Sequence, residues 1–225
     1  MSNPAPKLPP LIYNPPSGAL KILHSDDDIL VLSKPSGLLS VPGRAPGHED
    51  SLETRVRAEF PDALLIHRLD LETSGVFLMA RNKPAQKHIG LQFEKRETEK
   101  RYIARIWGHM KDDEGRVDLP LRCDWDNRPR QMVCHEHGKP AQTDWEVLER
   151  EDSGFTRVLL KPITGRSHQL RVHMEAIGYP MLGEVFYAHD EARDAAARLQ
   201  LHAESLTITH PRNNERVTFT DPCPF

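Results

Sequence analysis

The sequence predicts an α+β fold, with a mixed, largely antiparallel sheet and a few flanking helices. Its apolar residues fall in short runs of strand length, and most of these runs follow one another with only turn residues between them. A regular alternation of strands and helices, which indicates a doubly wound parallel sheet, is not seen. Only a few stretches show the apolar spacing of a surface helix. The 225 residues suffice for one large domain with its own core.

The first part of the chain reads as a proline-rich tail followed by two strands and a helix. Residues 1–18 hold six prolines, so we expect an extended or disordered tail, with one folded domain over 19–225. In residues 20–37 an Asp-rich turn separates two short strands. Residues 49–62 predict a helix capped by Asp50, because their apolar side chains recur at helical spacing before a proline.

The remaining elements follow from the same periodicities. Residues 64–80 read as two strands joined through charged residues and a Thr-Ser-Gly turn. A helix within 166–180 is expected to start at a Ser167 cap and to end at Gly178. The other predicted elements are a helix over 84–96, a strand over 100–108, several strands with a long loop over 119–150, a strand over 155–165, a helix over about 190–198 and a strand over 199–211.

Composition excludes several classes of protein. A net charge of −3 and a pI near 6.5 argue against a polycation that coats nucleic acid, so any RNA site must be local. No apolar run reaches membrane-spanning length, and the proline-rich start does not fit a signal peptide, so we expect a cytoplasmic protein with no membrane partner. Three cysteines without C-x-x-C spacing argue against a disulfide framework and a zinc site.

One basic stretch offers such a local RNA site. Residues 81–105 hold eight Lys or Arg against three Glu. Most charge runs of this kind are solvated helix faces, and that interpretation stays open beside RNA binding.

The segment "HRLDLETSG", residues 67–75, sets titratable side chains between two apolar runs. His67 and Arg68 are costly to bury without partners, so we expect a cleft with an apolar floor and a charged rim. Asp70 alone is typical of a turn former. A glycosidase-like pair of Asp70 with Glu72 is not supported, because a turn begins directly after Glu72.

A second polar cluster lies in "TGRSHQLRVHM", residues 164–174. At helical spacing His168 and Arg171 share a face, so Arg171 could reach a carboxylate across the cleft. An exposed ion pair with Glu175 is the alternative. His168 and His173 diverge around the helix and make a poor metal chelate. The run "CHEH" alternates between strand faces, which equally disfavours a metal site.

These motifs together resemble a known enzyme family. "HRLDLETSG", "KRYIARIWG", "KPITGRSHQLRVHM" and "RLQLHAESLTITHP", in this order, are similar to RluA-type RNA pseudouridine synthases over nearly the whole chain from about residue 20. The stretches "CDWDNRPRQMV" and "GKPAQT" resemble short, dual-specificity bacterial members, and no S4-type RNA-binding module is expected before Lys34. The resemblance implies isomerisation of uridine to pseudouridine in structured RNA loops, by base flipping and without a metal or other cofactor.

The resemblance also implies the targets and the alternatives. Two RNAs are expected, a tRNA anticodon stem-loop modified at uridine 32 and 23S rRNA modified at uridine 746, with the enzyme acting as a monomer. A synthase with a single rRNA or tRNA target is the first alternative. An RNA-binding protein without catalysis and a carboxylate-dependent glycosidase or nucleosidase are the others.

The family pattern implies a role for individual residues. Asp70 matches the catalytic carboxylate, as nucleophile or as base, and Arg171 matches the cation that keeps it ionised. Tyr102 matches the tyrosine that stacks on uracil and is a candidate to take the C5 proton. Leu199 or Leu201 should supply an apolar wall against the base. The residues expected to contact RNA are His67, Arg68, Arg128, Arg130, Arg166 and His168.

Overall fold

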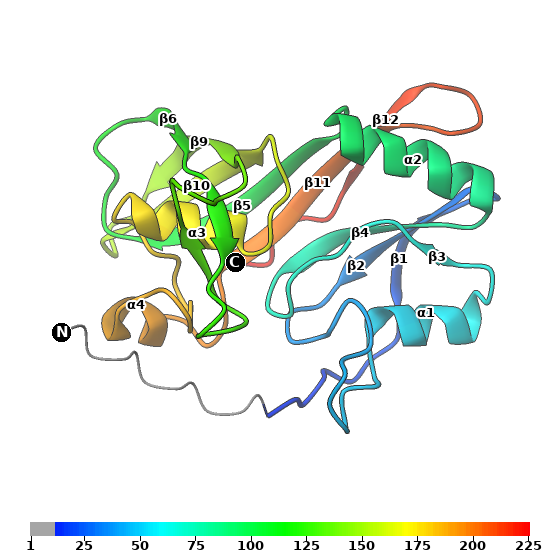
Figure 1. The fold of residues 1–225 in the computed structure, drawn as a ribbon, viewed down its shortest axis with the longest axis horizontal. Helices are drawn as coiled ribbons and strands as arrows, with labels where there is room; N and C mark the ends of the chain where they lie inside the picture. Colours follow the sequence, from blue (N-terminus) through cyan, green and yellow to red (C-terminus); the bar gives the residue numbers. More distant parts are fainter. Residues whose placement is uncertain (1–11) are drawn as a thin grey trace.

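A single mixed sheet organises the chain. The structure is a computed structural model that describes residues 12–225. Its strands are β1 Lys21–Ser25, β2 Ile29–Lys34, β3 Leu64–Leu65, β4 Ser74–Ala80, β5 Glu99–Trp107, β6 Glu114–Asp118, β7 Leu121–Cys123, β8 Gln131–Val133, β9 Gln142–Arg150, β10 Phe155–Pro162, β11 Leu201–Thr209 and β12 Arg216–Thr220. Ten of them form one sheet along the path β1-β2-β4-β11-β5-β10-β9-β6, with β3 beside β4 and β12 beside β11 (Figure 1). The strands β7 and β8 form a separate hairpin.

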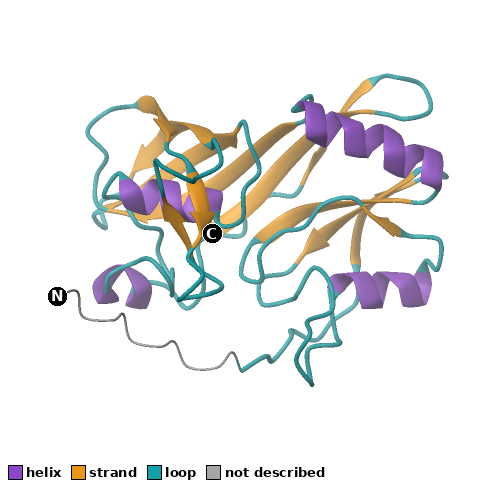
Figure 2. Ribbon diagram, in the orientation of Figure 1, coloured by secondary structure: helices purple, strands orange, loops and turns teal. Residues whose placement is uncertain are grey.

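The pairing confirms the predicted fold class. Within the described chain, β4 and β11 are the one parallel pair, and the other neighbours run antiparallel. Figure 2 shows how few helices accompany this sheet. The result is the α+β architecture that consecutive strand-length apolar runs predict.

Two helices cover opposite faces of the sheet around β2 and β4. They are α1 Leu52–Glu59 and α2 Lys83–Lys95. Leu30 packs on the α1 side, whereas its neighbour Val31 packs on the α2 side. Successive strand residues point to opposite faces, so strands buried on both sides need an apolar residue at nearly every position. This requirement explains the unbroken apolar runs in β2 and β4.

The cap of α1 differs from the prediction by one residue. Ser51 is the N-cap, and its Oγ accepts a hydrogen bond from the Thr54 N–H at 3.1 Å. Asp50, the predicted cap, instead forms an ion pair with Arg55 at 2.7 Å. Both residue types can cap a helix, so the sequence does not distinguish between these two neighbouring positions.

Two further helices belong to the half of the molecule around β5 and β10. α3 Gln169–Ala176 follows His168, whose left-handed φ of 52° begins the helix without a side-chain cap, so the predicted Ser167 cap is wrong. The helix ends before Gly178 at a φ of 87°, as expected. α4 Asp190–Asp194 ends earlier than the predicted residue 198. None of the helices within residues 12–225 has the length and apolar character needed to cross a bilayer.

Part of the proline-rich tail lies against the folded chain. Residues 1–11 fall outside the described residues, and residues 12–18 form neither helix nor strand. The Tyr13 hydroxyl donates to the Asp50 carbonyl at 2.8 Å, and Arg55 donates to the backbone of the same segment at 2.8 Å. The domain boundary at residue 19 stays a prediction.

The arrangement of the two halves positions the site. β1, β2 and β4 with α1 and α2 form one half, and β5, β10, β9 and β6 with α3 form the other (Figure 1). The strand β11 joins them at the centre. The loop between β3 and β4 and the loop that precedes α3 both border the hollow between the halves.

Candidate active site

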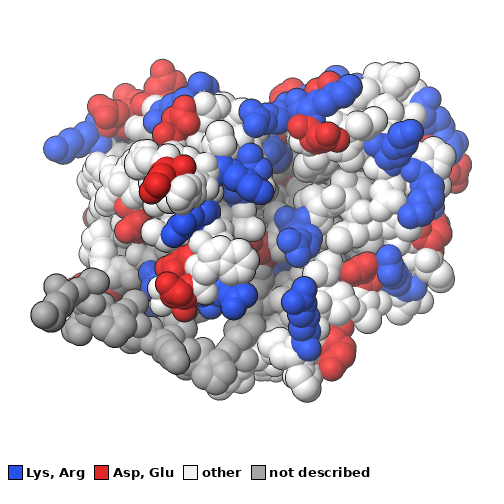
Figure 3. All heavy atoms as spheres, viewed as in Figure 1, with Lys and Arg blue, Asp and Glu red and all other residues white. Residues whose placement is uncertain are grey.

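A cleft of about 800 Å³ lies between the two halves of the molecule. Residues 66–71 form one wall, residues 164–171 form the other, and Tyr102 and Leu201 lie among the lining residues from the central strands. The two polar motifs of the sequence, residues 67–75 and 164–174, therefore meet in one cleft. Figure 3 shows Lys and Arg side chains on both sides of the hollow in the middle of this face.

Asp70 lies in the loop between β3 and β4, which is fixed on both sides of the aspartate. Ser40 Oγ donates to the Leu69 carbonyl at 2.6 Å and accepts from the Leu69 N–H at 3.1 Å. Lys34 Nζ donates to the Leu71 carbonyl at 3.0 Å. These contacts leave the backbone around Asp70 little freedom, while its side chain stays 28% exposed to the cleft.

Lys34 is a fully buried cation beneath this loop. Its Nζ also donates to the Pro35 carbonyl at 2.9 Å. Burial lowers its pKa to about 7, although the charges of Glu72 and Asp70 act in the opposite direction. The sequence indicates only a turn at this position, so Lys34 was not among the predicted site residues.

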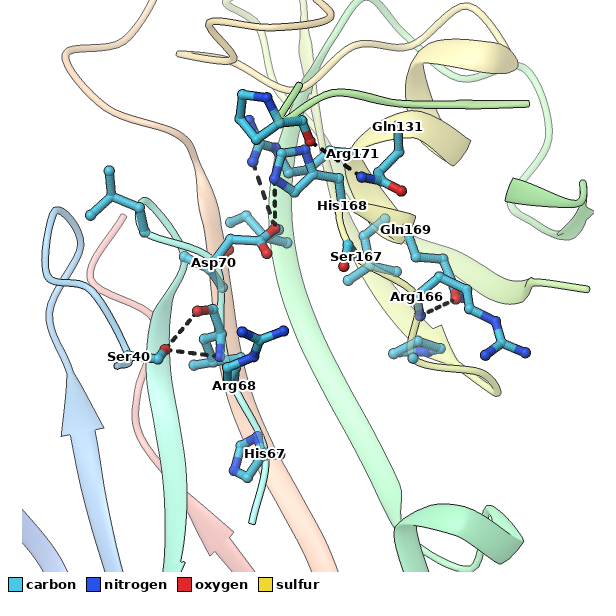
Figure 4. Close-up of a pocket in the computed structure, with 18 of the residues that line it drawn as sticks. Ser40, His67, Arg68, Asp70, Gln131, Arg166, Ser167, His168, Gln169 and Arg171 are labelled. Carbon is cyan, nitrogen blue, oxygen red and sulfur yellow. Dashed lines mark hydrogen bonds and ion pairs between the residues drawn. The ribbon is translucent and has the colours of Figure 1, made fainter. Parts of the chain in front are cut away.

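Arg171 reaches across the cleft toward Asp70. Its side chain comes from α3 and is 2% exposed, and Nη1 lies 3.6 Å from Asp70 Oδ2 (Figure 4). The predicted alternative, an ion pair of Arg171 with Glu175, is not formed among the described residues. Asp70, Arg171 and Tyr102 thus share one hollow, as the sequence motifs imply.

Glu184 is the partner of Arg171 that the sequence analysis missed. Its carboxylate accepts from Arg171 Nε at 2.5 Å and from Nη2 at 2.6 Å, and it is 1% exposed. The Phe186 N–H also donates to Glu184 at 2.7 Å. Burial by itself lowers the pKa of Arg171, but the hydrogen bonds and charge of Glu184 and the charge of Asp70 raise it. A single acid inside the apolar run "MLGEVFY" is the sequence signal for such a buried partner.

His168 connects Asp70 to a tyrosine that the sequence analysis also missed. Tyr187 accepts a hydrogen bond from the Gln131 N–H at 2.8 Å, and its hydroxyl lies 2.7 Å from His168 Nδ1. Burial lowers the pKa of His168, so its ring is neutral near pH 7. If the Tyr187 hydroxyl donates to Nδ1, the ring proton lies on Nε2, which faces Asp70 Oδ2 at 3.9 Å.

Tyr102 lines the cleft from β5. Burial and then the charge of Asp70 raise the pKa of Tyr102 above its usual value, so the phenol keeps its proton. Leu201 lines the cleft with it, whereas Leu199 packs in the core beneath and is absent from the lining. Of the two predicted apolar wall residues, only Leu201 is in position to face a base.

His67 lines the cleft and is packed against the protein, and its predicted contact with RNA stays a prediction. Its ring stacks between Phe77 and Phe93, with centroids 4.8 Å and 5.1 Å away, and Nε2 accepts from the Leu78 N–H at 3.0 Å. Burial lowers the pKa of His67 to about 4. A neutral ring carries no positive charge for a phosphate.

The arginines around the cleft have no acidic partners. Arg68, Arg128 and Arg166 line it, and Arg130 follows Arg128 by two residues and lies over the Tyr187 ring. Among residues 12–225 no Asp or Glu forms an ion pair with any of these four. Unpaired guanidinium groups around a cleft are suited to phosphate oxygens.

The basic run over 81–105 does not form one surface. Arg81 pairs with Asp62 at 2.9 Å, and Arg105 pairs with Glu151. Lys100 is the basic residue of this run that lines the cleft. The run therefore contributes to the site mainly at Lys100. Within the described chain, no group of three or more His, Cys, Asp or Glu is arranged to hold a metal ion.

Comparisons with known proteins agree with this geometry. Residues 28–176 match the family model described as RNA pseudouridylate synthase. The chain is 57% identical to the dual-specificity RNA pseudouridine synthase RluA of Escherichia coli K12 over 95% of its length and 98% of the relative's length. The RluA of Yersinia pestis is 60% identical over 84% of this chain and 92% of that protein. Among solved structures, human RNA pseudouridylate synthase domain containing 1 superposes with a TM-score of 0.76 at 32% identity, covering 97% of this chain and 87% of that one.

Proposed function

Because the chain belongs to the RNA pseudouridylate synthase family and isomerises uridine to pseudouridine in RNA, we propose that Asp70 is its catalytic residue and that it modifies two structured RNAs. The observation that carries the catalytic assignment is the 3.6 Å approach of Arg171 Nη1 to Asp70 Oδ2 inside a cleft of about 800 Å³. A buried cation opposite a carboxylate favours its ionised form, which is the reactive form.

The reaction rearranges bonds without gain or loss of atoms. The bond from ribose C1′ to uracil N1 breaks, the base turns, and a bond from C1′ to C5 forms. The C5 proton leaves to solvent, and N1 takes up a proton. One carboxylate serves this chemistry, either as a nucleophile at C1′ or as a base at C2′ that gives a glycal-type intermediate.

Three groups assist Asp70 in this proposal. Arg171 places a positive charge beside the carboxylate, and Glu184 holds Arg171 in place through two contacts of 2.5 Å and 2.6 Å. Tyr102 stacks on the uracil opposite Leu201. Because the phenol keeps its own proton, its oxygen accepts the C5 proton while its own proton passes to the Asp70 carboxylate, which is free again once the C1′–C5 bond has formed and which releases the proton to solvent.

The arginines of the cleft hold the RNA around the extruded nucleotide. A uridine inside a folded loop must leave its stack to reach Asp70. Arg68 is exposed, lies two residues before Asp70, and is therefore close to the path of the base. Arg166, Arg128 and Arg130 contact phosphates and loop nucleotides, and the neutral His168 donates from Nε2.

The two proposed targets are uridines in a tRNA anticodon stem-loop and in 23S rRNA. The relatives at 57% and 60% identity both bear the name dual-specificity RNA pseudouridine synthase. An enzyme with two targets selects the shape that their loops share. We further propose that the chain acts in the cytoplasm as a monomer.

The test measures tritium released to water from RNA labelled at uridine C5. Purified protein is incubated separately with tRNA and with 23S rRNA fragments, and modified sites are mapped by carbodiimide primer extension. We expect release from both RNAs, and no release with Asp70→Asn although RNA binding is retained. Equal turnover by wild type and Asp70→Asn would refute the catalytic assignment, and release from one RNA alone would refute dual specificity.

A further inference from the structure

A compact loop between β7 and β8 forms one rim of the cleft. The Asp124 N–H donates to the Arg130 carbonyl at 3.0 Å, which closes the base of the loop. The Asn127 N–H donates to Asp124 at 3.2 Å, and the Arg130 N–H donates to Asn127 at 3.1 Å. Asn127 Nδ2 also donates to Asp124 Oδ2 at 2.9 Å. These contacts give the tip a defined shape.

The loop is attached to the group that faces Asp70. Gln131, the first residue after it, donates from its backbone to the Tyr187 hydroxyl at 2.8 Å, and that hydroxyl lies 2.7 Å from His168 Nδ1. The Arg130 guanidinium lies over the Tyr187 ring at 5.5 Å. Tyr187 therefore connects the loop to His168, which lies on the wall of the cleft that faces Asp70.

Trp125 is presented to solvent by this loop. Its side chain is 67% exposed, although tryptophan is highly buried on average in folded proteins. No aromatic ring of the described chain pairs with it. Arg128, which itself lines the cleft, places its guanidinium 5.2 Å from the indole centroid. An exposed indole next to a guanidinium that lines the cleft is suited to a flat, aromatic ligand.

The charge of the loop selects the class of that ligand. Arg128 and Arg130 form no ion pair with an acidic side chain in residues 12–225; Arg128 lines the cleft, and Arg130 lies over the Tyr187 ring. An exposed aromatic ring with unpaired arginines is the combination that binds single-stranded nucleic acid, where bases stack on rings and phosphates meet guanidinium groups.

We propose that Trp125 and Arg128 form a stacking platform for one unpaired base of the substrate RNA that neighbours the extruded uridine. The proposal rests on the proposed function and extends it to the recognition of the loop. Extrusion of the uridine removes the stacking partners of the adjacent bases. A base that stacks on Trp125 regains part of that stacking, so the platform favours loops whose neighbouring nucleotide can turn outward.

The experiment couples a change in the protein to a change in the RNA. The probe is a tRNA anticodon stem-loop whose modification by the wild type has first been shown by tritium release. Its Kd is measured for wild type, Trp125→Ala, Trp125→Phe and Trp125→Leu, and the set is repeated with RNAs that carry one abasic loop nucleotide each. Leu148→Ala is the matched control, since Leu148 is an apolar side chain 46% exposed on β9 and absent from the cleft lining.

Trp125→Ala and Trp125→Leu should each weaken binding about tenfold, the size of one base-aromatic stack. Trp125→Phe should keep most of the affinity, Leu148→Ala should change nothing, and the rate at saturating RNA should stay within twofold for all variants. At one loop position, an abasic nucleotide should weaken wild-type binding by the same factor as Trp125→Ala does. The same abasic RNA should cause no further loss of affinity in Trp125→Ala.

Two outcomes would overturn the platform. One is unchanged RNA affinity in Trp125→Ala and Trp125→Leu, and the other is that the loss from Trp125→Ala adds to the loss from the abasic nucleotide at every loop position. Failure of the proposed function looks different, because the wild type then releases no tritium from any uridine-containing RNA.

Discussion

Arg171 and Glu184 form a buried bidentate ion pair that leaves one arginine nitrogen for Asp70. Glu184 binds Nε and Nη2 at 2.5 Å and 2.6 Å, and Nη1 lies 3.6 Å from Asp70 Oδ2. That last distance exceeds a hydrogen bond, so Arg171 acts on Asp70 mainly through its charge. The carboxylate therefore has a positive charge beside it while its lone pairs remain open to the ribose.

Glu184→Gln should slow the reaction far more than it weakens RNA binding. Gln binds the guanidinium less firmly than Glu, so Arg171 can move toward Asp70 and bind it directly. A displacement of about 1 Å in such a site lowers the rate about 100-fold. Loss of one partner of a buried ion pair should also lower the free energy of unfolding by about 3 kcal/mol. Single-turnover rates, Kd and chemical denaturation measure these effects. Glu175→Gln, on the exposed side of α3, is the control. An unchanged rate in Glu184→Gln would contradict the proposal that Glu184 holds Arg171 in place.

Tyr102→Phe should bind RNA normally, but its turnover should be at least about 100-fold slower than that of the wild type. The ring that stacks on uracil remains, whereas the hydroxyl that relays the C5 proton is lost, and such proton transfers contribute about 100- to 10,000-fold. Tritium release under single-turnover conditions measures the loss. Tyr179→Phe, in a tyrosine that packs against the core, is the control. Wild-type release from Tyr102→Phe would assign the proton to another acceptor.

Arg68→Ala should weaken the RNA complex and reduce its salt dependence, whereas His67→Gln should do neither. Arg68 is an exposed cation at the cleft, and each phosphate contact adds about one to the slope of log Kd against log salt. Gln can accept the Leu78 N–H in place of the neutral His67 ring. Binding isotherms at several salt concentrations compare the two. A reduced slope in His67→Gln would confirm the RNA contact predicted for that histidine.

Lys34→Met should remove a pH dependence of stability between about pH 7 and the usual lysine range. Burial lowers the pKa of Lys34 to about 7 in the folded protein, so the unfolded chain binds more protons above that pH. Stability from this group therefore rises as pH increases from 7 and is lost as pH falls. Denaturation of wild type and Lys34→Met over pH 6 to 10 gives the difference in slope. Parallel curves would show that Lys34 titrates normally.

The sequence alone determined the fold class, most elements and the three central candidates for catalysis. Apolar periodicity is a local property, so unbroken runs such as those of β2 and β4 predict strands buried on both faces. Asp70, Tyr102 and Arg171 could be named because the motifs that hold them are specific, and the structure brings these three into one cleft.

Only the tertiary structure decided which polar groups are paired and therefore what charge each carries. His67 and His168 look alike in the sequence, yet one stacks between Phe77 and Phe93 and the other faces Asp70. Glu184 lies 13 residues from Arg171 along the chain. It can bind Arg171 only because the chain after α3 folds back on the helix. Burial and ion pairing depend on neighbours that are distant in sequence, and no local pattern encodes those distances.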